Sequence, residues 1–398
     1  MKQPLITLSA WNDFWLEYLQ AGLARRGFGT RVLSTRKYQK LAGAEYCWLS
    51  DILTRAYQRL SYMRTPVLEA ALYNYENFAA ARCLDTPCFW GWSGHHLKAF
   101  RRAKNVGIPL VLESGSTHPL WQWNVLKTEH ERAGIPFSEQ KPGARRIKML
   151  KEIELADHIC VPSTFVASTY RTHGVPEDKL AINPYGANVA AWSQVIRRQK
   201  KGTEPFIVVY TASLIYRKGA RYLLKAWKRA ALSNAELWIV GGVFVPVQEL
   251  EGGTLPNIHI LGFKSHEELA KIYETADAYV LPSLEEGLAR SVIEAMAAGL
   301  PIIVTEETGA RDVTGSRECG WIVPSQDTEA LADAFQDAAH NRDRTFVWGQ
   351  NARLAALPFT WDAYGDRAGA FLETIIGPPQ GKNNPETNLS PMDSREEL

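Results

Sequence analysis

The sequence predicts an α/β protein with two doubly wound domains that face each other across a cleft. At 398 residues, the chain is longer than a single hydrophobic core usually supports, which favours two domains. Short apolar runs alternate with helix-like segments, and such alternation is typical of parallel sheets covered by helices on both faces. Residues 195–204 are charged and poor in apolar side chains, so they separate two alternating series.

In the first series, short apolar runs predict strands and longer amphipathic stretches predict helices. The predicted strands are Leu5–Ser9, Arg31–Ser34, Cys88–Gly91, Pro109–Glu113 and His158–Pro162. The predicted helices are Asp13–Arg26, Leu49–Tyr62, His95–Asn105, Ile147–Ala156 and Thr164–Thr172. A strand end and turn at 182–186 close this series.

The second series repeats the pattern with shorter connections. Its predicted strands are Phe206–Ala212, Glu236–Val240, Ile258–Leu261, Ala278–Leu281, Pro301–Val304 and Trp321–Val323. Its predicted helices are Ala220–Leu232, 266–275, 289–298, 328–339 and Trp361–Ile376. Two parallel sheets then place their ligand between the carboxyl ends of their strands.

These patterns divide the chain into a Rossmann-like domain at 1–190, a linker at 191–204 and a second Rossmann-like domain at 205–358. We expect a C-terminal helix at 359–376 to pack back toward the first domain. The stretch 377–398 is rich in Pro, Asn, Ser and charge, which predicts disorder.

Composition indicates a soluble globular protein, with 45% hydrophobic and 22% charged residues. No apolar run reaches the roughly 18 residues of a membrane span, so we expect no transmembrane helix. The N-terminal sequence does not have the pattern of a signal peptide. The five cysteines are scattered without metal-ligand spacing, which favours free thiols in a reducing cytoplasm.

The net charge of +2 hides an uneven distribution. Residues 1–190 hold 24 Lys and Arg against 16 Asp and Glu, whereas the rest of the chain is acidic. Two interpretations of this basic half stay open. The charges belong either to solvated helix faces or to a surface that meets anionic lipid headgroups or an acidic acceptor. No nucleic-acid-binding motif accompanies the charge, so we expect no nucleic-acid partner.

The segment 279–304, YVLPSLEEGLARSVIEAMAAGLPIIV, holds the most informative pattern in the chain. An apolar strand ends at Pro282, an acidic turn with Gly287 follows, and then a helix and a second strand. Glu294 is the only charge between Val292 and Val304. A buried carboxylate without a partner is costly, so Glu294 either pairs internally or lines a cleft and binds a polar ligand.

A second pattern, YTASLIYRKGAR at 210–221, places Arg217 and Lys218 before Gly219, where a helix begins. Cations are disfavoured at a helix N-terminus because the macrodipole is positive there. Two cations at this position fit a bound phosphate or diphosphate, although basic turns on protein surfaces are also common.

Together the two patterns identify a family that the second half of the chain resembles: retaining glycosyltransferases of family 4, also called glycosyl transferases group 1, with the GT-B fold. Members carry two Glu residues eight positions apart, a glycine after the first, and EAMA followed by G-x-P around the second. Here these are Glu286-Gly287 and EAMAAGLP from Glu294, and the family's Lys-Gly turn matches Lys218-Gly219. The segments 262–283, 154–188 and FTWDAY at 359–364 are also similar, so the resemblance covers about 150–376.

The resemblance implies a role for each matched position. Glu286 would attend the transferred sugar as the catalytic carboxylate, and Glu294 would hold the ribose hydroxyls of the donor nucleotide. Arg217, Lys218 and the backbone amides at 287–289 would bind the donor diphosphate; these amides belong to Gly287, Leu288 and Ala289. The family usually needs no metal, and this chain has no Asp-x-Asp motif, so we expect no metal and no cofactor besides the nucleotide sugar.

The chain departs from the family pattern at two places. Many members have an Arg where this chain has Ser213, and we expect Arg217 to supply that charge. Many also have a glycine-rich loop after the first strand, which is Ser9-Ala10-Trp11-Asn12-Asp13 here.

The family often places a histidine in the catalytic site. His118, after the predicted strand 109–113, is the first candidate for this role. It would hydrogen-bond the sugar or polarise the reacting centre, without acting as a base. His95 and His96 are the alternatives for this position.

The resemblance implies a hexosyltransferase-type enzyme that moves a sugar from a UDP- or GDP-sugar to a glycan or lipid-linked acceptor. Surface polysaccharide or glycolipid biosynthesis at the cytoplasmic face of a membrane would be its setting. A catalytically inactive sugar-nucleotide-binding or partner subunit is the alternative. A glycoside hydrolase needs two carboxylates about 5–9.5 Å apart, and eight helical residues span about 12 Å. A dinucleotide oxidoreductase is disfavoured because no Gly-x-Gly-x-x-Gly follows a strand.

Overall fold

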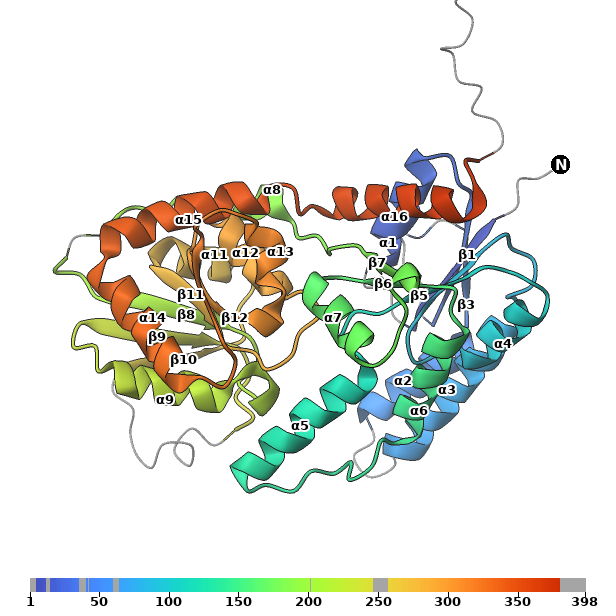
Figure 1. Cartoon of the computed structure of the whole chain (residues 1–398), viewed down its shortest axis with the longest axis horizontal. Coiled ribbons are helices and arrows are strands. Elements are labelled where there is room, and N and C mark those ends of the chain that lie inside the picture. The colour runs from blue at the N-terminus through green and yellow to red at the C-terminus, as the bar shows by residue number, and fades with distance from the viewer. Residues whose placement is uncertain are drawn as a thin grey trace, which may run out of the picture.

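A computed structural model describes residues 5–11, 15–35, 41, 43–59, 64–200, 202–245 and 257–379. The chain forms two α/β domains side by side, with the N-terminal domain and the C-terminal domain each built on its own sheet (Figure 1). None of the helices in the described part of the chain has the length and apolar content needed to cross a bilayer.

The N-terminal domain holds a seven-stranded parallel sheet. In spatial order, its strands are β3 (Ala44–Tyr46), β2 (Thr30–Ser34), β1 (Ile6–Ser9), β4 (Phe89–Trp92), β5 (Leu110–Glu113), β6 (His158–Val161) and β7 (Leu180–Ile182). The helices are α1 (Leu16–Arg25), α2 (Trp48–Arg59), α3 (Arg64–Ala80), α4 (Leu97–Asn105), α5 (Pro119–Ala133), α6 (Ala144–Leu155) and α7 (Thr164–Thr172).

The C-terminal domain holds a six-stranded parallel sheet. In spatial order, its strands are β10 (Ile258–Gly262), β9 (Ala235–Val240), β8 (Phe206–Thr211), β11 (Ala278–Leu281), β12 (Ile302–Thr305) and β13 (Gly320–Val323). The helices are α9 (Ala220–Ala230), α11 (His266–Thr275), α12 (Arg290–Ala297), α13 (Ala310–Thr314), α14 (Thr328–His340) and α15 (Arg342–Ala356).

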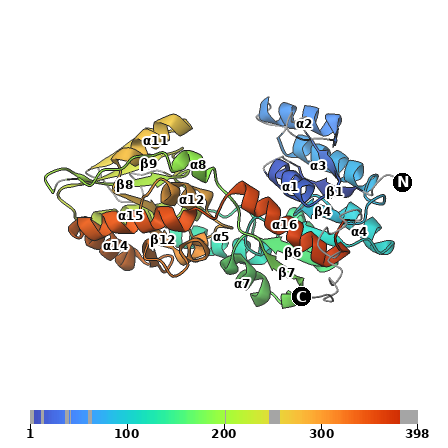
Figure 2. The same cartoon turned by 90° about the horizontal axis from the view of Figure 1, so that it is seen from above.

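Two segments cross between the domains. The chain passes from α8 (Val189–Trp192) to β8, and Arg197 anchors this connection by donating to the backbone oxygens of Ala276 and Gly299. The chain then returns after α15, so that α16 (Trp361–Ile376) lies along α1 of the N-terminal domain (Figure 2). A Cβ on Gly22 would lie 2.1 Å from the backbone of Gly365, so this helix pair meets backbone to backbone.

Among the described residues, five helices lie outside the sequence predictions, namely α3, α5, α8, α13 and α15, and so does the short edge strand β3; for the edge strand β7 only its end was predicted. In α3, α5 and α15, polar and apolar residues are spread around the helix, so no single apolar stripe identifies them. The predicted helices at 13–26 and 49–62 correspond to α1 and α2. Residues 12–14, 60–63 and the predicted disordered stretch from 380 onward lie outside the described residues.

The last residue of β5, Glu113, ties α16 to the N-terminal sheet. Its carboxylate is 2% exposed and accepts hydrogen bonds from Trp90 Nε1 at 3.0 Å and from the hydroxyl of Tyr364 at 3.0 Å. Burial raises the pKa of Glu113 from 4.5 to about 7, against the opposing effect of these two hydrogen bonds. A proton on this carboxyl is therefore bound more tightly in the folded protein than in the unfolded chain.

Through this linkage, the contribution of Glu113 to stability falls as the pH rises from about 4.5 to about 7 and levels off above that range. Glu113 alone contributes about 3 kcal/mol to this fall. In Glu113→Gln, the amide can accept from Trp90 and donate to Tyr364, so we expect a smaller drop in melting temperature between pH 5 and pH 8. The exposed Glu154→Gln on α6 is the control and should keep the drop of the unaltered protein. Equal drops in Glu113→Gln and the unaltered protein would contradict the linkage.

Candidate active site

The turn from Pro282 to Ala289 connects β11 to α12 and lies against the N-terminal domain. The hydroxyl of Ser163, after β6, donates to the backbone oxygen of Gly287 at 2.6 Å. A Cβ on Gly287 would lie 2.1 Å from the backbone oxygen of Gly115, so only glycine fits this close approach. The carboxyl ends of the two sheets therefore meet at this turn.

Glu286 stands at the centre of a charged cluster on this turn. Lys218 Nζ forms an ion pair with Glu286 Oε1, and Arg217 Nη1 lies 3.4 Å from the same oxygen. Ser283 Oγ donates to it at 3.0 Å. The two cations and the first carboxylate that the sequence singles out are thus brought together.

The Lys-Gly turn has a backbone reason for its glycine. Gly219 follows the 3-10 turn η2 (Tyr216–Lys218) with φ of 74°, and a Cβ there would lie 1.8 Å from the backbone oxygen of Pro282. The turn that carries the cations therefore packs directly on the turn that carries Glu286. Ser213, which stands where many family members have Arg, lies before this turn, and Arg217 extends to both Glu285 and Glu286.

Glu285, which we did not single out from the sequence, is completely buried between the domains. Its Oε1 accepts from Ser116 Oγ at 2.5 Å, Thr117 Oγ1 at 2.8 Å and Thr117 N at 3.2 Å. Its Oε2 accepts from Gln122 Nε2 at 3.2 Å and lies 3.4 Å from Arg217 Nη1. Burial would raise its pKa, but Arg217 and these hydrogen bonds hold the pKa of the carboxyl below its ordinary value.

At the N-terminal end of α12, one of the backbone amides predicted to bind the diphosphate already has a partner. The amide of Ala289 donates to the backbone oxygen of Thr308 at 3.0 Å, because η3 (Glu306–Thr308) packs on the start of the helix. This amide already has a backbone partner in the structure, and its role toward a diphosphate stays a prediction. Within the described residues, the amides of Gly287 and Leu288 have no such backbone partner.

Glu294 combines the two arrangements that the sequence left open. Its carboxylate lies 3.7 Å from Arg290 Nε on the same helix, and burial raises its pKa although Arg290 opposes this. It also lines a cavity of about 610 Å³ between the domains. The cavity is formed by Asn188, Ala191, Trp192, His266, Glu267, Ala270, Arg290, Glu294 and Trp361. A polar ligand in this cavity can therefore reach the Glu294 carboxylate.

His118 is the N-cap of α5, where its ring accepts from the amide of Leu120 at 3.3 Å. The ring stacks on His173 with centroids 4.2 Å apart, and burial, with His173 as a second cause, lowers the pKa of His118 to about 4. The imidazole is thus neutral and occupied in capping, so the structure places it in a structural position. Its predicted role toward the sugar stays a prediction.

The two alternative histidines differ from each other. His96 is fully buried, with its ring nitrogens bonded to the oxygens of Trp92 and Ser9, so it is part of the core. His95 stacks on Trp11 at 5.5 Å and lines a separate cavity at the carboxyl ends of β1 and β4. Its place at this cavity distinguishes His95 from the core residue His96.

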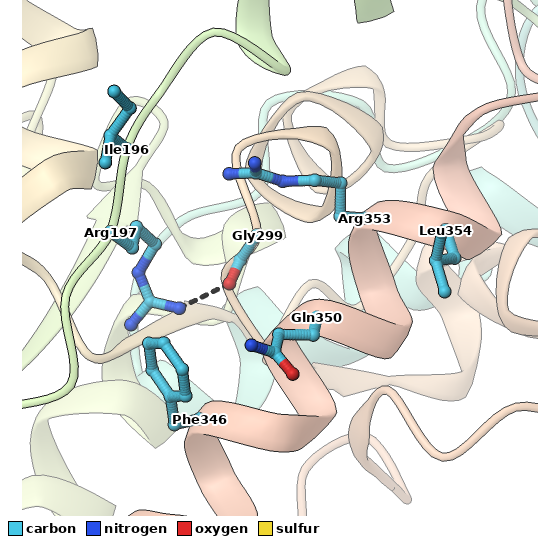
Figure 3. Close-up of a pocket in the computed structure, with 7 residues that line it drawn as sticks. All are labelled: Ile196, Arg197, Gly299, Phe346, Gln350, Arg353 and Leu354. Atoms are coloured by element: carbon cyan, nitrogen blue, oxygen red, sulfur yellow. Dashed lines mark hydrogen bonds between the residues drawn. The ribbon is translucent and has the colours of Figure 1, made fainter.

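One further cavity, of about 340 Å³, lies away from this cluster, between the crossing segment and α15 (Figure 3). Arg197 and Arg353 flank it, and both use their guanidinium groups to bind backbone oxygens. These arginines hold the crossing chain in place. Among the described residues, no group of three or more His, Cys, Asp or Glu side chains could hold a metal ion.

Residues 193–355 match the family described as Glycosyl transferases group 1. Over these residues, which span the C-terminal domain, the chain is similar to glycosyl transferases group 1. The matched range contains Arg217, Lys218, Glu286 and Glu294, so the resemblance found in the sequence is confirmed.

Two curated relatives are similar to this chain over about half of its length. It is 27% identical over 217 residues to a GDP-mannose-dependent α-(1-6)-phosphatidylinositol monomannoside mannosyltransferase of Mycobacterium tuberculosis, covering 51% of this chain and 55% of the relative. It is 26% identical over 228 residues to a putative colanic acid biosynthesis glycosyltransferase of Salmonella typhimurium, covering 52% and 54%. The chain therefore matches about half the length of each relative.

Among solved structures, HepE of Anabaena in complex with UDP and glucose superposes with a TM-score of 0.62 at 15% identity. The superposition covers 94% of this chain and 100% of that protein. This likeness shows the fold, and the predicted GT-B architecture of two Rossmann-like domains is confirmed.

Proposed function

We propose that the chain is a retaining, hexosyltransferase-type glycosyltransferase. It moves a sugar from a nucleoside-diphosphate sugar to a glycan or lipid-linked acceptor in surface polysaccharide or glycolipid biosynthesis. The observation that carries this proposal is the convergence of Arg217, Lys218 and Glu286 where the carboxyl ends of the two sheets meet. Two relatives support it: one named as a GDP-mannose-dependent mannosyltransferase and one named as a putative colanic acid biosynthesis glycosyltransferase.

The charges of the cluster suit a diphosphate leaving group. Lys218 and Arg217 supply two positive charges, and the amides of Gly287 and Leu288 lie at the N-terminal end of α12, where the helix dipole favours an anion. Bringing a diphosphate to these cations replaces part of their pairing with Glu286, which frees the carboxylate to face the sugar. Such pre-placed charges stabilise the developing charge on the leaving diphosphate without a metal ion.

In the proposed step, the bond between the anomeric carbon of the sugar and the β-phosphate oxygen breaks. A bond from the acceptor hydroxyl oxygen to the same carbon forms on the same face. The hydroxyl proton passes to the departing phosphate oxygen, so the diphosphate serves as the base. Glu286 positions and polarises the sugar, and Glu294 holds the ribose hydroxyls from the wall of the cavity between the domains.

The donor is identified by binding and then by turnover. Thermal melting is measured with UDP, GDP, ADP and the matching sugars, because a ligand at about 100-fold excess over Kd stabilises by roughly 2.7 kcal/mol. Release of nucleoside diphosphate from the sugar form, without added metal and with EDTA as a parallel arm, then tests turnover. If no nucleoside diphosphate raises the melting temperature, the transferase proposal fails. Binding without release would point to an inactive nucleotide-binding subunit.

Arg217→Ala tests the proposed compensation for Ser213. We expect donor affinity to fall by about 10- to 100-fold, because a charge-assisted contact to a phosphate is lost. Isothermal titration with the nucleoside diphosphate that binds measures this change. The matched control is Arg229→Ala, which removes an exposed cation of α9 that pairs with Glu329 at the domain surface. Unchanged affinity and turnover in Arg217→Ala would show that another group carries this charge.

The proposed location is the cytoplasmic face of a membrane, with peripheral attachment through the basic N-terminal half. Co-sedimentation with vesicles tests this. We expect the protein to bind vesicles that contain anionic phosphatidylglycerol, to release them at high salt, and to leave neutral phosphatidylcholine vesicles unbound. Equal binding to both vesicle types would contradict an electrostatic attachment.

A further inference from the structure

A cavity of about 330 Å³ opens at the carboxyl ends of β1 and β4 in the N-terminal domain. It is lined by Ala10, Trp11, Leu68, Leu72, Trp92, Ser93, His95 and Arg145. The strand order β1-β4-β5 places this cavity at the same carboxyl end of the sheet as Ser116 and Thr117, which contact Glu285 of the turn from Pro282 to Ala289. The cavity therefore lies at the carboxyl end of the N-terminal sheet, which is the end that meets the C-terminal domain.

Three buried polar atoms at this cavity have no hydrogen-bond partner in the described part of the chain. They are Trp92 Nε1, Ser93 Oγ and His95 Nδ1. A buried polar group without a hydrogen-bond partner is costly, and native proteins leave few such groups without one. Their position on one cavity wall indicates that a polar ligand completes their hydrogen bonding.

The rings at the cavity are held in fixed orientations. Trp11 stacks on His95 at 29° between ring planes and makes an edge contact with Tyr75 at 5.5 Å. The hydroxyl of Tyr75 is bonded to Ser9 Oγ, which in turn bonds the core histidine His96. Flat aromatic faces of this kind pack well against the apolar face of a sugar ring.

Arg145 adds a positive charge at this cavity, and no described residue neutralises it through an ion pair. Its guanidinium lies beside the backbone of Gly94, where a Cβ would be 3.6 Å from Arg145 Nε, and no described residue forms an ion pair or hydrogen bond with it. The neighbouring cation Lys148 is already paired with Glu76 at 3.0 Å. Burial, His96, Arg145 and Lys148 together lower the pKa of His95, so its ring is neutral and offers one donor and one acceptor.

We propose that this cavity binds the acceptor through a sugar residue that carries an anionic group, a carboxylate or a phosphate. The anion pairs with Arg145, the ring packs on Trp11, and the sugar hydroxyls bond Ser93 Oγ, Trp92 Nε1 and His95. That this sugar belongs to the acceptor rests on the proposed function, whereas the recognition of an acidic sugar follows from the cavity itself. An inorganic anion alone would leave the aromatic and leucine walls uncovered, so an acidic sugar fits better than phosphate.

The test measures binding without turnover. Ligand-observed NMR titrations use methyl glucuronide, glucose 6-phosphate, the neutral methyl glucoside and inorganic phosphate. We expect at least one acidic sugar to bind about 10-fold or more tightly than the neutral glucoside and than phosphate. The preferred acidic sugar tells a carboxylate site from a phosphate site.

Arg145→Ala should weaken that binding by about 10- to 100-fold, and Arg145→Lys should weaken it less. The control Arg101→Ala removes an exposed cation of α4 outside the cavity and should bind as the unaltered protein does. Since Arg145 is exposed, the variant should keep the melting temperature of the unaltered protein. Equal binding of neutral and acidic sugars, unchanged binding in Arg145→Ala, or no binding of any acidic sugar would overturn the proposal.

Failure of this proposal is separable from failure of the proposed function. If a nucleotide sugar is hydrolysed but no acidic sugar binds, the transferase stands and the acidic-acceptor site falls. If acidic sugars bind through Arg145 but no nucleoside diphosphate binds, the site stands as a sugar site and the transferase proposal falls.

Discussion

Glu286→Gln is expected to lower the turnover number by about 100- to 1000-fold while changing donor affinity by less than about threefold, because the lost carboxylate acts mainly in the transition state. In the structure, this carboxylate is paired with Lys218, Arg217 and Ser283, and a bound donor diphosphate would take over part of the pairing with the two cations, so that the carboxylate faces the sugar. Glutamine keeps the shape and one oxygen, so the substitution removes mainly the charge.

Glu294→Ala is the matching half of this prediction. Glu294 lies on α12, apart from the turn that carries the cations, and lines the cavity between the domains, where it would hold the ribose. We therefore expect donor affinity to fall by about 10-fold or more, with turnover at saturating donor changed by less than about threefold. Steady-state kinetics and titration with the nucleoside diphosphate measure the two parameters separately.

The control for both variants is Glu329→Gln, whose carboxylate is exposed and pairs with Arg229 on the surface of the C-terminal domain. It should keep both turnover and affinity. If Glu286→Gln and Glu294→Ala change both parameters by the same factor, the division of labour between the two carboxylates is wrong.

The fold could be predicted because its signal is local. Each core strand of the two sheets is a short apolar run, and buried parallel strands such as β5, β8, β11 and β12 need no partner sequence to be recognised. Helices with a strong apolar stripe, such as α9, were predictable for the same reason. By contrast α3, α5 and α15 have polar and apolar residues spread around the helix, and the face that α15 buries includes Thr345 and Gly349, so no apolar stripe reveals these helices.

The site was predictable where a residue stands out against its own segment. Glu294 is a charge on an apolar helix, and Lys218 is a cation at a helix start, so each conflicts with its local pattern. Ala289 shows the limit of this reasoning, because its amide is occupied by Thr308, a residue from another turn. For His118, the following Pro119 was a usable signal, since proline at the first position of a helix makes the preceding residue the N-cap.

The burial of Glu285 could not be predicted, because the sequence pattern of a second Glu on an acidic turn is typical of a solvated charge. Its burial depends on Ser116, Thr117 and Gln122, which come from the other domain. The Glu285 carboxylate becomes buried and connects the domains only because the carboxyl ends of the two sheets meet at this turn.

Glu285→Ala is expected to lower the melting temperature by about 5–15 °C, because removing one member of a buried charged network costs about 3–5 kcal/mol. The hydroxyls of Ser116 and Thr117 would lose their acceptor in a site where Glu285 is completely buried, and Arg217 would lose one of its two carboxylate partners. We expect donor affinity to fall as well, because the two domains are no longer held at the turn that carries Glu286.

Glu285→Gln separates hydrogen bonding from charge. Its amide oxygen can keep the bonds from Ser116 and Thr117, but the amide nitrogen would face Gln122 Nε2 and Arg217 Nη1, which are both donors. The melting temperature should therefore fall by an intermediate amount. Differential scanning fluorimetry of both variants, with Glu329→Gln as the surface control, gives the comparison. A melting temperature and donor affinity in Glu285→Ala equal to those of the unaltered protein would show that contacts such as Ser163 to Gly287 and Thr164 to Asp312 are sufficient to hold the domains together.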